Sequence, residues 1–324
     1  MGKMKGKNMK TLIIGAGAVG VAIGVSLAEE YSKIAFLTSE DTKKVIDANG
    51  VGRTGIFGSK HCEAGETQTY SNYSDLPNEE FDFIIVCTKT MANEATSLKI
   101  SEHRSCLKSF GKIIIMQNGW GNEVPYLKYF DKDQVFNARL STGFVKTSPN
   151  ISDITVYAAP LLIGSINGCD HEILIPIEQI LNENGIKTEL TTQIEEALWA
   201  KMLYNTTLNP LGAILKVPYG KLIDAENSIA IMSDLIEETF MVMKAAGYKT
   251  FWKKSAEYKE VFFGKLVPET REHRSSTLQD IDKKNKTEIE TLSGTVVRLG
   301  EKFGVDVSTH RMMYRLVRTM EELF

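Results

Sequence analysis

Apolar residues in the first half of the chain fall in short runs that end in glycine or polar residues. The run TLII (11–14) leads through GAGAVG (15–20) into a helix-length apolar stretch, and KIAFLT (33–38) follows it. This order predicts a strand, a tight turn, a helix and a second strand, which make one βαβ unit. Two more apolar runs, at 81–89 and 111–119, also end in polar residues, as parallel strands do where they meet a ligand crevice.

The strand-like pattern gives way to helical periodicity in the second half of the chain. β-rich pieces between residues 135 and 163 predict that the same sheet continues, and residues 171–185 have the pattern of a helix ended by its final glycine. Long helical segments follow at 194–215, 228–247, 275–304 and 309–324. The sequence therefore predicts an α/β domain over residues 9–190 and an all-α domain over 191–324, with a cleft between them.

Composition narrows the class of protein. The chain has 324 residues, of which 43% are hydrophobic, so it can bury a core large enough for two domains. A net charge of −3 provides no basic field for nucleic acid or an acidic membrane, which favours a small-molecule partner. Four scattered cysteines without a CxxC pair or a histidine cluster indicate reduced thiols in the cytoplasm and no metal site.

The uncharged stretch from Thr11 to Ala28 is close to the minimum length of a membrane span. Four glycines interrupt it where a strand would turn into a helix, and no cleavage site follows a short apolar core, so neither a span nor a signal peptide is predicted. Residues 1–8 are interpreted as a disordered leader or a remnant of cloning.

Gly15, Gly17 and Gly20 form a GxGxxG motif between the first predicted strand and helix. In this context the glycines allow a tight turn, close approach of the backbone to a pyrophosphate and close packing of the helix on the strand. The motif predicts a Rossmann-like dinucleotide-binding domain, although the glycines could also serve a turn alone. The predicted contacts are Gly15, Ala16, Gly17, Ala18, Val19 and Gly20.

The end of the second strand leaves the choice between NADP and NAD open. NAD enzymes usually place an acidic residue there and NADP enzymes a basic one, whereas this chain has Thr38, Ser39 and Glu40. Lys43 and Lys44 follow a few residues later. They could meet a 2′-phosphate, or they could be ordinary charges on a solvated helix.

Lys89 and Asn118 each follow an apolar strand, so both are candidates for the crevice at the strand ends. Lys89 is interpreted as a ligand contact because its stem would pack behind a buried strand while its ammonium reaches the crevice. Asn118, which precedes Gly119, could instead belong only to a turn.

Three polar residues, Lys201, Asn205 and Asn209, are spaced four apart in a segment with helical periodicity. On a helix they fall on one face over about 12 Å. The face is interpreted as a row of donors toward a cleft, with a solvated edge ending in an asparagine cap before Pro210 as the alternative. Further along, Ser276 and Glu288 could face the same cleft, although the charges between them are typical of a solvated helix.

Taken together, these motifs resemble the ketopantoate reductase family, which makes pantoate by reducing a 2-oxo acid with NADPH. The resemblance runs from about Met9 to Leu323. It is carried by GAGAVG (15–20), TK (88–89), QNG (117–119), LWAKMLYNTTLNPLGAI (198–214) and SSTLQDIDKKNKTEIETLSGTVVRLGEKFGV (275–305). The last two are specific, since other Rossmann dehydrogenases lack them. The resemblance implies an all-α second domain of the 6-phosphogluconate dehydrogenase C-terminal-like type.

The resemblance also implies roles for residues beyond the glycine turn. The lysine matching Lys201 is the proposed general acid, and an ammonium can both protonate and stabilise an alkoxide. The implied substrate-binding residues are Asn118, Asn205, Asn209, Ser276 and Glu288. The implied cofactor-binding residues outside the turn are Ser39, Lys89, Asn118 and Glu288. Arg274 is a candidate for the substrate carboxylate.

Three positions depart from the family pattern. Ser39 stands where an arginine often binds the NADP phosphate, Ala92 where glutamine is common, and Thr277 where methionine is usual. The predicted function is NADPH-dependent reduction of 2-dehydropantoate in pantothenate biosynthesis, with NAD as the alternative cofactor and other branched or aromatic 2-oxo acids as alternative substrates. A dinucleotide-sensing protein is the non-enzymatic alternative. A homodimer is left open.

Overall fold

The computed structural model describes residues 8–324 and divides into two compact units. The first unit comprises the chain up to Gln117 together with Asn122–Ile194, and the second comprises Asn118–Gly121 and Glu195–Phe324. All but the last residue of the predicted leader (1–8) lies outside the described residues.

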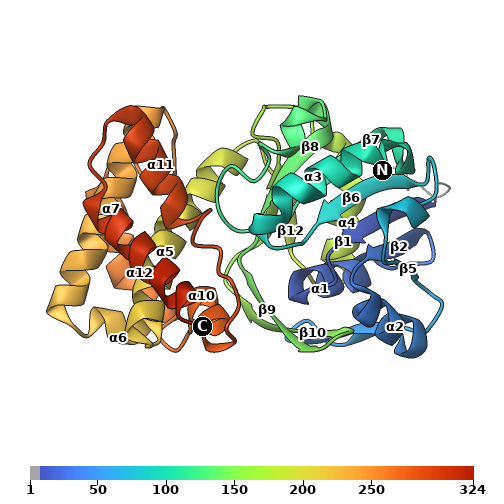
Figure 1. The fold of residues 1–324 in the computed structure, drawn as a ribbon, viewed down its shortest axis with the longest axis horizontal. Helices are drawn as coiled ribbons and strands as arrows, with labels where there is room; N and C mark the ends of the chain where they lie inside the picture. Colours follow the sequence, from blue (N-terminus) through green and yellow to red (C-terminus); the bar gives the residue numbers. More distant parts are fainter. Residues whose placement is uncertain (1–7) are drawn as a thin grey trace. The chain divides into compact units, whose positions relative to one another are not determined.

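The first unit is built on a main sheet of eight strands in the order β12-β11-β8-β7-β6-β1-β2-β5 (Figure 1). The strands are β1 (Met9–Ile14), β2 (Ser32–Leu37), β5 (Gln68–Tyr70), β6 (Phe81–Val86), β7 (Leu107–Ile115), β8 (Val135–Arg139), β11 (Leu161–Gly164) and β12 (Thr188–Leu190). β1 pairs in parallel with β2 and β6, and β7 in parallel with β6 and β8. The four strands predicted as parallel are confirmed, while β11 runs antiparallel to β8.

The helices of the first unit are α1 (Ala18–Leu27), α2 (Glu40–Asn49), α3 (Asn93–Glu102) and α4 (Ile175–Glu183). Short 3₁₀ turns are η1 (Tyr73–Asp75), η2 (Thr90–Ala92), η3 (Arg104–Cys106), η4 (Tyr126–Lys128), η5 (Lys132–Gln134) and η6 (Glu172–Leu174). The helix predicted to end at Gly185 is α4, and this glycine adopts a φ of +86°, which a side chain rarely tolerates.

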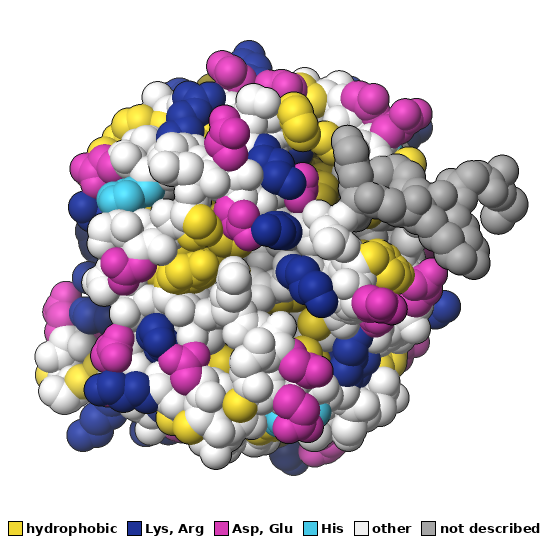
Figure 2. Space-filling view, turned by 90° about the vertical axis from the view of Figure 1, so that its right-hand side faces the viewer, with side chains coloured by type: hydrophobic (Ala, Val, Ile, Leu, Met, Phe, Trp, Pro, Cys, Tyr) yellow, Lys and Arg dark blue, Asp and Glu magenta, His cyan; other side chains and the backbone are white. Residues whose placement is uncertain are grey.

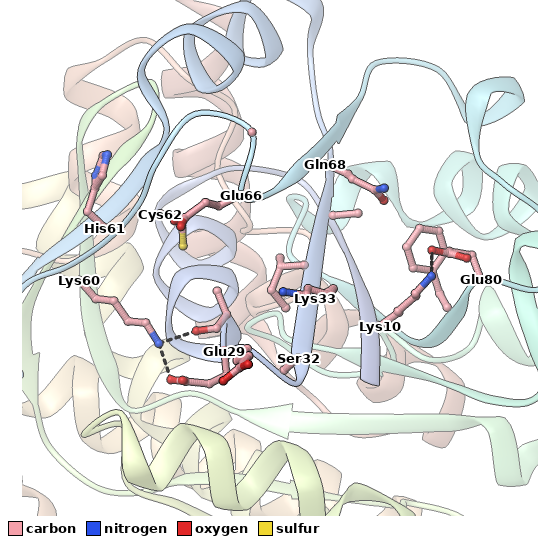
Figure 3. A pocket seen from close by; sticks show the side chains of 16 residues that line it. Lys10, Glu29, Ser32, Lys33, Lys60, His61, Cys62, Glu66, Gln68 and Glu80 are labelled. Carbon is pink, nitrogen blue, oxygen red and sulfur yellow. Dashed lines mark hydrogen bonds and ion pairs between the residues drawn. The ribbon is translucent and has the colours of Figure 1, made fainter. Parts of the chain in front are cut away.

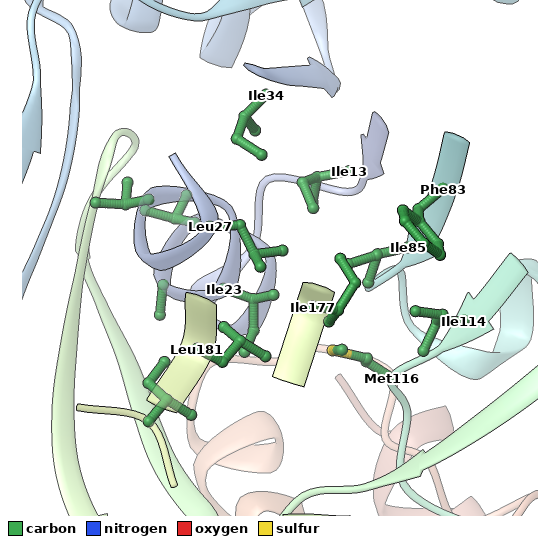
Figure 4. Packing of buried hydrophobic residues seen from close by; sticks show 14 of the residues in the cluster. Ile13, Ile23, Leu27, Ile34, Phe83, Ile85, Ile114, Met116, Ile177 and Leu181 are labelled. Carbon is green, nitrogen blue, oxygen red and sulfur yellow. The ribbon is translucent and has the colours of Figure 1, made fainter. Parts of the chain in front are cut away.

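Both faces of the main sheet are buried. On one face, Ile13 and Ile85 of the central strands pack with Ile23 of α1 and Ile177 of α4 (Figure 4). Because neighbouring strand residues point to opposite faces, the residue after Ile13 belongs to the cluster on the other face, which includes Ile100 of α3. This two-sided burial is the reason why the strands appear in the sequence as uninterrupted apolar runs.

A separate sheet of four strands corrects one prediction. β3 (Val51–Gly55), β4 (Lys60–Cys62), β9 (Thr142–Ser148) and β10 (Ile151–Tyr157) pair in the order β4-β3-β10-β9. The prediction that every β-rich piece between 135 and 163 continues the main sheet is therefore wrong for β9 and β10. This hairpin packs against α1, where Ser152 Oγ donates to the carbonyl of Ala18 at 2.7 Å. Its outer residues are exposed, whereas a strand of the main sheet is covered on both faces.

The second unit contains helices and no strand within the described residues, as predicted. Its helices are α5 (Ile194–Leu215), α6 (Tyr219–Ile223), α7 (Glu226–Ala246), α8 (Ser255–Val261), the π-helical η7 (Phe262–Leu266), α9 (Val267–Glu269), α10 (Ser276–Asp282), α11 (Ser293–Phe303) and α12 (Ser308–Glu322). α7, α11 and α12 pack against one another. α7 ends at Gly247 in the left-handed conformation.

The segment 275–304, predicted as one helix, is instead two helices joined by a loop. α10 stops because Lys284 turns into the left-handed region (φ +55°) and the N–H of Asn285 donates back to the carbonyl of Asp280 at 2.8 Å. The Glu321 carboxylate then accepts from the N–H (2.8 Å) and the hydroxyl (2.6 Å) of Thr287. Charged side chains with good helical propensity gave no sign of this break, because the carboxylate that stabilises the loop lies far along the chain.

On the face drawn in Figure 2, basic and acidic side chains are interspersed, so neither sign of charge dominates that face. Among residues 8–324, no helix combines the length and apolarity that crossing a membrane requires. Within the same residues, no group of histidine, cysteine or acidic side chains is arranged to hold a metal ion.

His310 of α12 is fully buried against α7. Its Nε2 lies 3.0 Å from the carbonyl of Leu235 and 2.9 Å from Oγ1 of Thr239, while Nδ1 has no partner in the described part of the chain. A protonated ring would carry a second N–H with no acceptor, and burial lowers the pKa of His310 to about 4.

We predict that His310 weakens the folded state as the pH falls from about 6.5 toward 4. The unfolded chain takes up the proton near the ordinary histidine pKa of about 6.5, whereas the folded chain does so only near 4, so unfolding gains up to about 1.4 kcal/mol per pH unit in this window. Urea unfolding of wild type and His310→Gln at pH 7, 6 and 5 measures the effect. Equal pH slopes for the two proteins would contradict it.

Candidate active site

Two glycines of the turn after β1 are required by the fold itself. Gly15 has a φ of +97°, and a Cβ there would lie 2.9 Å from the backbone nitrogen of Thr88. A Cβ on Gly20 would lie 1.9 Å from the carbonyl oxygen of Gly15. A side chain at Gly20 would push α1 away from the turn, and a side chain at Gly15 would push the turn away from the loop after β6.

Gly17 is different, because the protein itself gives no reason for a glycine there. Its backbone is extended (φ −79°, ψ −169°), and a Cβ would meet no atom within 4 Å. It precedes the first turn of α1, formed by Ala18 and Val19, which no side chain caps. The bare backbone and the unused N–H groups of the helix end fit a pyrophosphate, which needs close approach and donors.

Ser39 lies directly after β2 and caps α2. Its hydroxyl oxygen accepts from the N–H of Thr42 at 3.4 Å, and its hydroxyl donates to Oγ1 of the same threonine at 3.2 Å. Lys43 forms an ion pair with Asp47 at 2.5 Å, and Lys44 lies 4.0 Å from Glu40. Both lysines therefore have carboxylate neighbours on their own helix, as solvated helix charges do.

Lys89 follows β6, next to a buried network of amides. The Nε2 of Gln117 donates to the carbonyl of Thr88 at 2.7 Å and to Oδ1 of Asn93 at 2.8 Å. In return, Nδ2 of Asn93 donates to Oε1 of Gln117 at 2.9 Å and to Oδ1 of Asn122 at 3.2 Å. The network joins the loops that follow β6 and β7. Neither Asn93 nor Asn122 was a candidate from the sequence, since a loop amide becomes informative only when its partners are known.

The sheet order β6-β1-β2 brings together three of the predicted cofactor elements. Lys89, the glycine turn and Ser39 follow three adjacent parallel strands, so all lie at the carboxyl edge of the main sheet. This edge is where doubly wound sheets bind their ligands.

In the second unit, α5 carries the predicted polar row. Asn205 and Asn209 are buried, with 8% and 3% of their surface exposed, and Lys201 is half-buried. α5 continues through Pro210, so Asn209 is not a cap and the solvated-edge interpretation is wrong. The hydroxyl of Tyr219 donates to Oδ1 of Asn209 at 2.5 Å. This bond fixes the amide so that its Nδ2, a donor, points away from the tyrosine.

His273 lies near the Lys201 ammonium. Burial, and in smaller measure this ammonium, lower the pKa of His273, so the ring is neutral at neutral pH. His273 also packs against the ring of Tyr219 at 5.2 Å between centroids. Neither aromatic residue was a candidate in the sequence, because neither lies on the helix that carries the lysine.

Ser276 is the exposed first residue of α10, whereas the preceding Ser275 is buried. Ser275 donates to the carbonyl of Asn209 at 3.3 Å and accepts from the N–H of Leu278 at 3.0 Å. The buried serine thus attaches α10 to α5, and Ser276 follows it directly. Arg274, the candidate for a substrate carboxylate, forms an ion pair with Asp282 at 2.7 Å.

Asn118 and Glu288, predicted from distant parts of the sequence, are brought together in the second unit. Nδ2 of Asn118 donates to Oε2 of Glu288 at 3.5 Å. The loop that carries Asn118 is anchored by Trp120, whose N–H donates to a carbonyl at 3.3 Å and whose ring lies 5.0 Å from Trp199 and 4.9 Å from Tyr248. Aromatic packing of this kind holds a short loop without regular structure in place.

A hollow of about 730 Å³ in the first unit lies at the opposite edge of the main sheet from the glycine turn (Figure 3). Residues at the amino ends of β1, β2 and β6 line it. The glycine turn, Ser39 and Lys89 follow the carboxyl ends of the same three strands. Lys60 is held there by Glu29 at 2.6 Å, and Lys10 is paired with Glu80. The hollow is therefore separate from the residues that the motifs single out, and it is not the candidate site.

Known proteins resemble this chain over nearly its whole length. The family model described as "Ketopantoate reductase PanE/ApbA" matches residues 11–168, and its C-terminal counterpart matches 193–321. The 2-dehydropantoate 2-reductase of Aquifex aeolicus is 33% identical and covers 97% of each chain.

Two solved structures have the same fold. The PanE/ApbA family ketopantoate reductase from Ralstonia eutropha JMP134 is 25% identical, covers 97% of this chain and 99% of its own, and superposes with a TM-score of 0.84. D-mandelate dehydrogenase, solved with NADH and anilino(oxo)acetate, is 21% identical with the same coverage and a TM-score of 0.83. At that identity, the likeness concerns the fold alone.

Replacing Gly17 tests the turn. We predict that Gly17→Val abolishes NADPH and NADH binding, because the side chain fills the space at the bare backbone, and that Gly17→Ala weakens it less. Neither variant should unfold the protein, since the backbone conformation suits any residue and no atom lies within 4 Å. Fluorescence titration measures binding, and the melting temperature is the control. Undiminished affinity in a folded Gly17→Val protein would place the cofactor elsewhere.

Proposed function

Because the chain belongs to the ketopantoate reductase family, we propose that it reduces 2-dehydropantoate (ketopantoate) to pantoate with a reduced nicotinamide dinucleotide. The reaction is a step of pantothenate and coenzyme A biosynthesis. The observation that supports it most directly is the polar row on α5, in which the half-buried Lys201 is followed by two buried amides and one amide is oriented by Tyr219. A protein that only senses a dinucleotide would not need a proton donor in this position.

Lys201 is the general acid of the proposed mechanism. A dinucleotide held at the glycine turn would supply the hydride that the carbonyl carbon of the substrate needs. Lys201 donates a proton to the oxygen on which negative charge develops, and its positive charge stabilises that oxygen before the proton moves. His273, whose pKa is lowered by burial and by this ammonium, adds no positive charge of its own beside Lys201 at neutral pH.

The remaining polar residues orient the substrate. Nδ2 of Asn209, fixed by Tyr219, and the amide of Asn205 are donors for substrate oxygens. Ser276 donates to the carboxylate of the 2-oxo acid. Glu288 accepts from the hydroxyl that distinguishes ketopantoate from simpler 2-oxo acids, and Asn118 steadies the Glu288 carboxylate.

We predict that Lys201→Ala lowers kcat roughly 10²- to 10⁴-fold while dinucleotide binding is kept, since the change removes the proton donor and leaves the glycine turn intact. Steady-state kinetics with ketopantoate and a binding titration measure the two effects. Lys221→Ala is the control, because it removes an exposed lysine of the same unit. A Lys201→Ala protein with wild-type kcat would remove this residue from the mechanism.

For the cofactor, we propose that NADPH is preferred over NADH by a modest factor. Ser39 and Lys43 stand in only partly for the arginine that would bind a 2′-phosphate. Lys43 is also paired with Asp47, which limits what it adds. We expect the ratio of kcat/KM for the two cofactors to rise in Ser39→Arg, because a guanidinium binds phosphate through two parallel hydrogen bonds. An unchanged ratio would show that the 2′-phosphate does not meet residue 39. A wild-type enzyme that strongly prefers NADH would overturn the preference itself.

Substrate choice is the second part of the proposal, and other branched or aromatic 2-oxo acids are the competing candidates. We predict that kcat/KM favours ketopantoate over an analogue of similar shape without the hydroxyl, and that Glu288→Ala removes most of this preference. A site built around a polar contact discriminates strongly against a substrate that leaves the contact unmade.

The test is a two-by-two comparison of enzyme and substrate, so that general damage from the mutation cancels. Glu269→Ala, which removes an exposed carboxylate of the same unit, is the matched control. Equal losses on both substrates would make Glu288 structural. A wild-type preference for the analogue without the hydroxyl would favour the competing substrates.

A further inference from the structure

Lys146 reaches the glycine turn from a distant part of the sequence. It lies on β9, at the edge of the four-stranded sheet, and its Nζ donates to the carbonyl oxygen of Ala16 at 2.9 Å, across 130 residues of chain. Ala16 stands between Gly15 and Gly17. The ammonium is therefore held at the stretch of backbone where the protein leaves room for a pyrophosphate.

The surroundings of this ammonium favour an anion. Lys146 is an exposed residue, but its ammonium lies against the backbone of the turn, where partial burial lowers the pKa of Lys146. Within residues 8–324, Lys146 forms no ion pair with a carboxylate, unlike Lys43 or Lys60, and its hydrogen-bond partner is a neutral carbonyl. A lysine has three N–H donors, so two remain for another acceptor. Desolvating a cation without an opposite charge is unfavourable, and an anion beside it would offset that cost.

We propose that Lys146 is a dinucleotide-binding residue whose ammonium pairs with the pyrophosphate of the cofactor. The inference rests on the proposed cofactor site at the glycine turn and adds a charged side chain to the backbone donors of that turn. One N–H of Lys146 stays on Ala16 and positions the ammonium, and the others contact phosphate oxygens. The four-stranded sheet then has a function beyond covering α1, because it carries the counter-charge to the turn.

The experiment compares Lys146→Met, which keeps the length of the side chain but removes its charge, with Lys146→Arg, which keeps the charge. Lys33→Met is the matched control, since Lys33 is an exposed lysine of the same unit on β2. Dissociation constants for NADPH and NADH are measured at two salt concentrations, together with the melting temperature. No step depends on catalysis, so the readout is independent of the general acid.

We expect Lys146→Met to weaken both dinucleotides by the same factor, roughly ten- to a hundredfold, as for the loss of a hydrogen-bonded charge. Its binding should also depend less on salt than that of the wild type, because one ion pair is gone. Lys146→Arg should retain most of the affinity, and Lys33→Met should bind as the wild type does.

Four results would overturn the inference. Unchanged affinity in Lys146→Met would exclude the contact while leaving the proposed function intact, provided that Gly17→Val still abolishes binding. Loss of NADPH affinity alone would assign the ammonium to the 2′-phosphate. Equal losses in the Met and Arg variants with an unchanged salt dependence would make Lys146 a structural support of Ala16. A wild-type protein that binds neither dinucleotide would refute the proposed function and this inference together.

Discussion

The first unit depends on how closely α1 approaches the sheet. Gly20 lies so near the carbonyl of Gly15, and Gly15 so near the loop after β6, that neither position has room for a Cβ. This contact brings the amino end of α1 to the carboxyl ends of β1 and β6. It also presents the outer side of α1 to the four-stranded sheet, and so places β9 within reach of Ala16. One steric constraint thus positions the backbone donors and the lysine together.

The second unit solves a different problem, which is to hold polar side chains in fixed orientations inside an apolar helical body. A buried amide without partners is unfavourable, and an amide free to flip would present donor and acceptor at random. Tyr219 removes this ambiguity for Asn209 by binding its oxygen. Ser275 attaches the start of α10 to the same helix, and Glu321 shapes the loop that carries Glu288. The site residues are therefore supported by neighbours that need not touch a substrate.

Features determined by local sequence were predictable. The glycine turn follows from three glycines within six residues, and the polar row of α5 from a spacing of four, so both are confirmed as structural elements. Features determined by distant partners were not predictable. The pairing of β10 with β3, the break after α10 and the position of Lys146 each depend on residues remote in the chain. A lysine within an exposed strand looks like a surface charge until the carbonyl that it binds is known.

The aromatic cluster that anchors residues 118–121 also affects how the protein absorbs and emits light. Two of the protein's three tryptophans, Trp120 and Trp199, lie 5.0 Å apart between ring centroids, and Tyr248 packs against both. Trp252 packs separately on Tyr258. At that separation the indole rings share their electronic excitation. The loop that presents Asn118 thus contains an intrinsic chromophore pair, and its displacement would change the near-ultraviolet dichroism of the unlabelled protein.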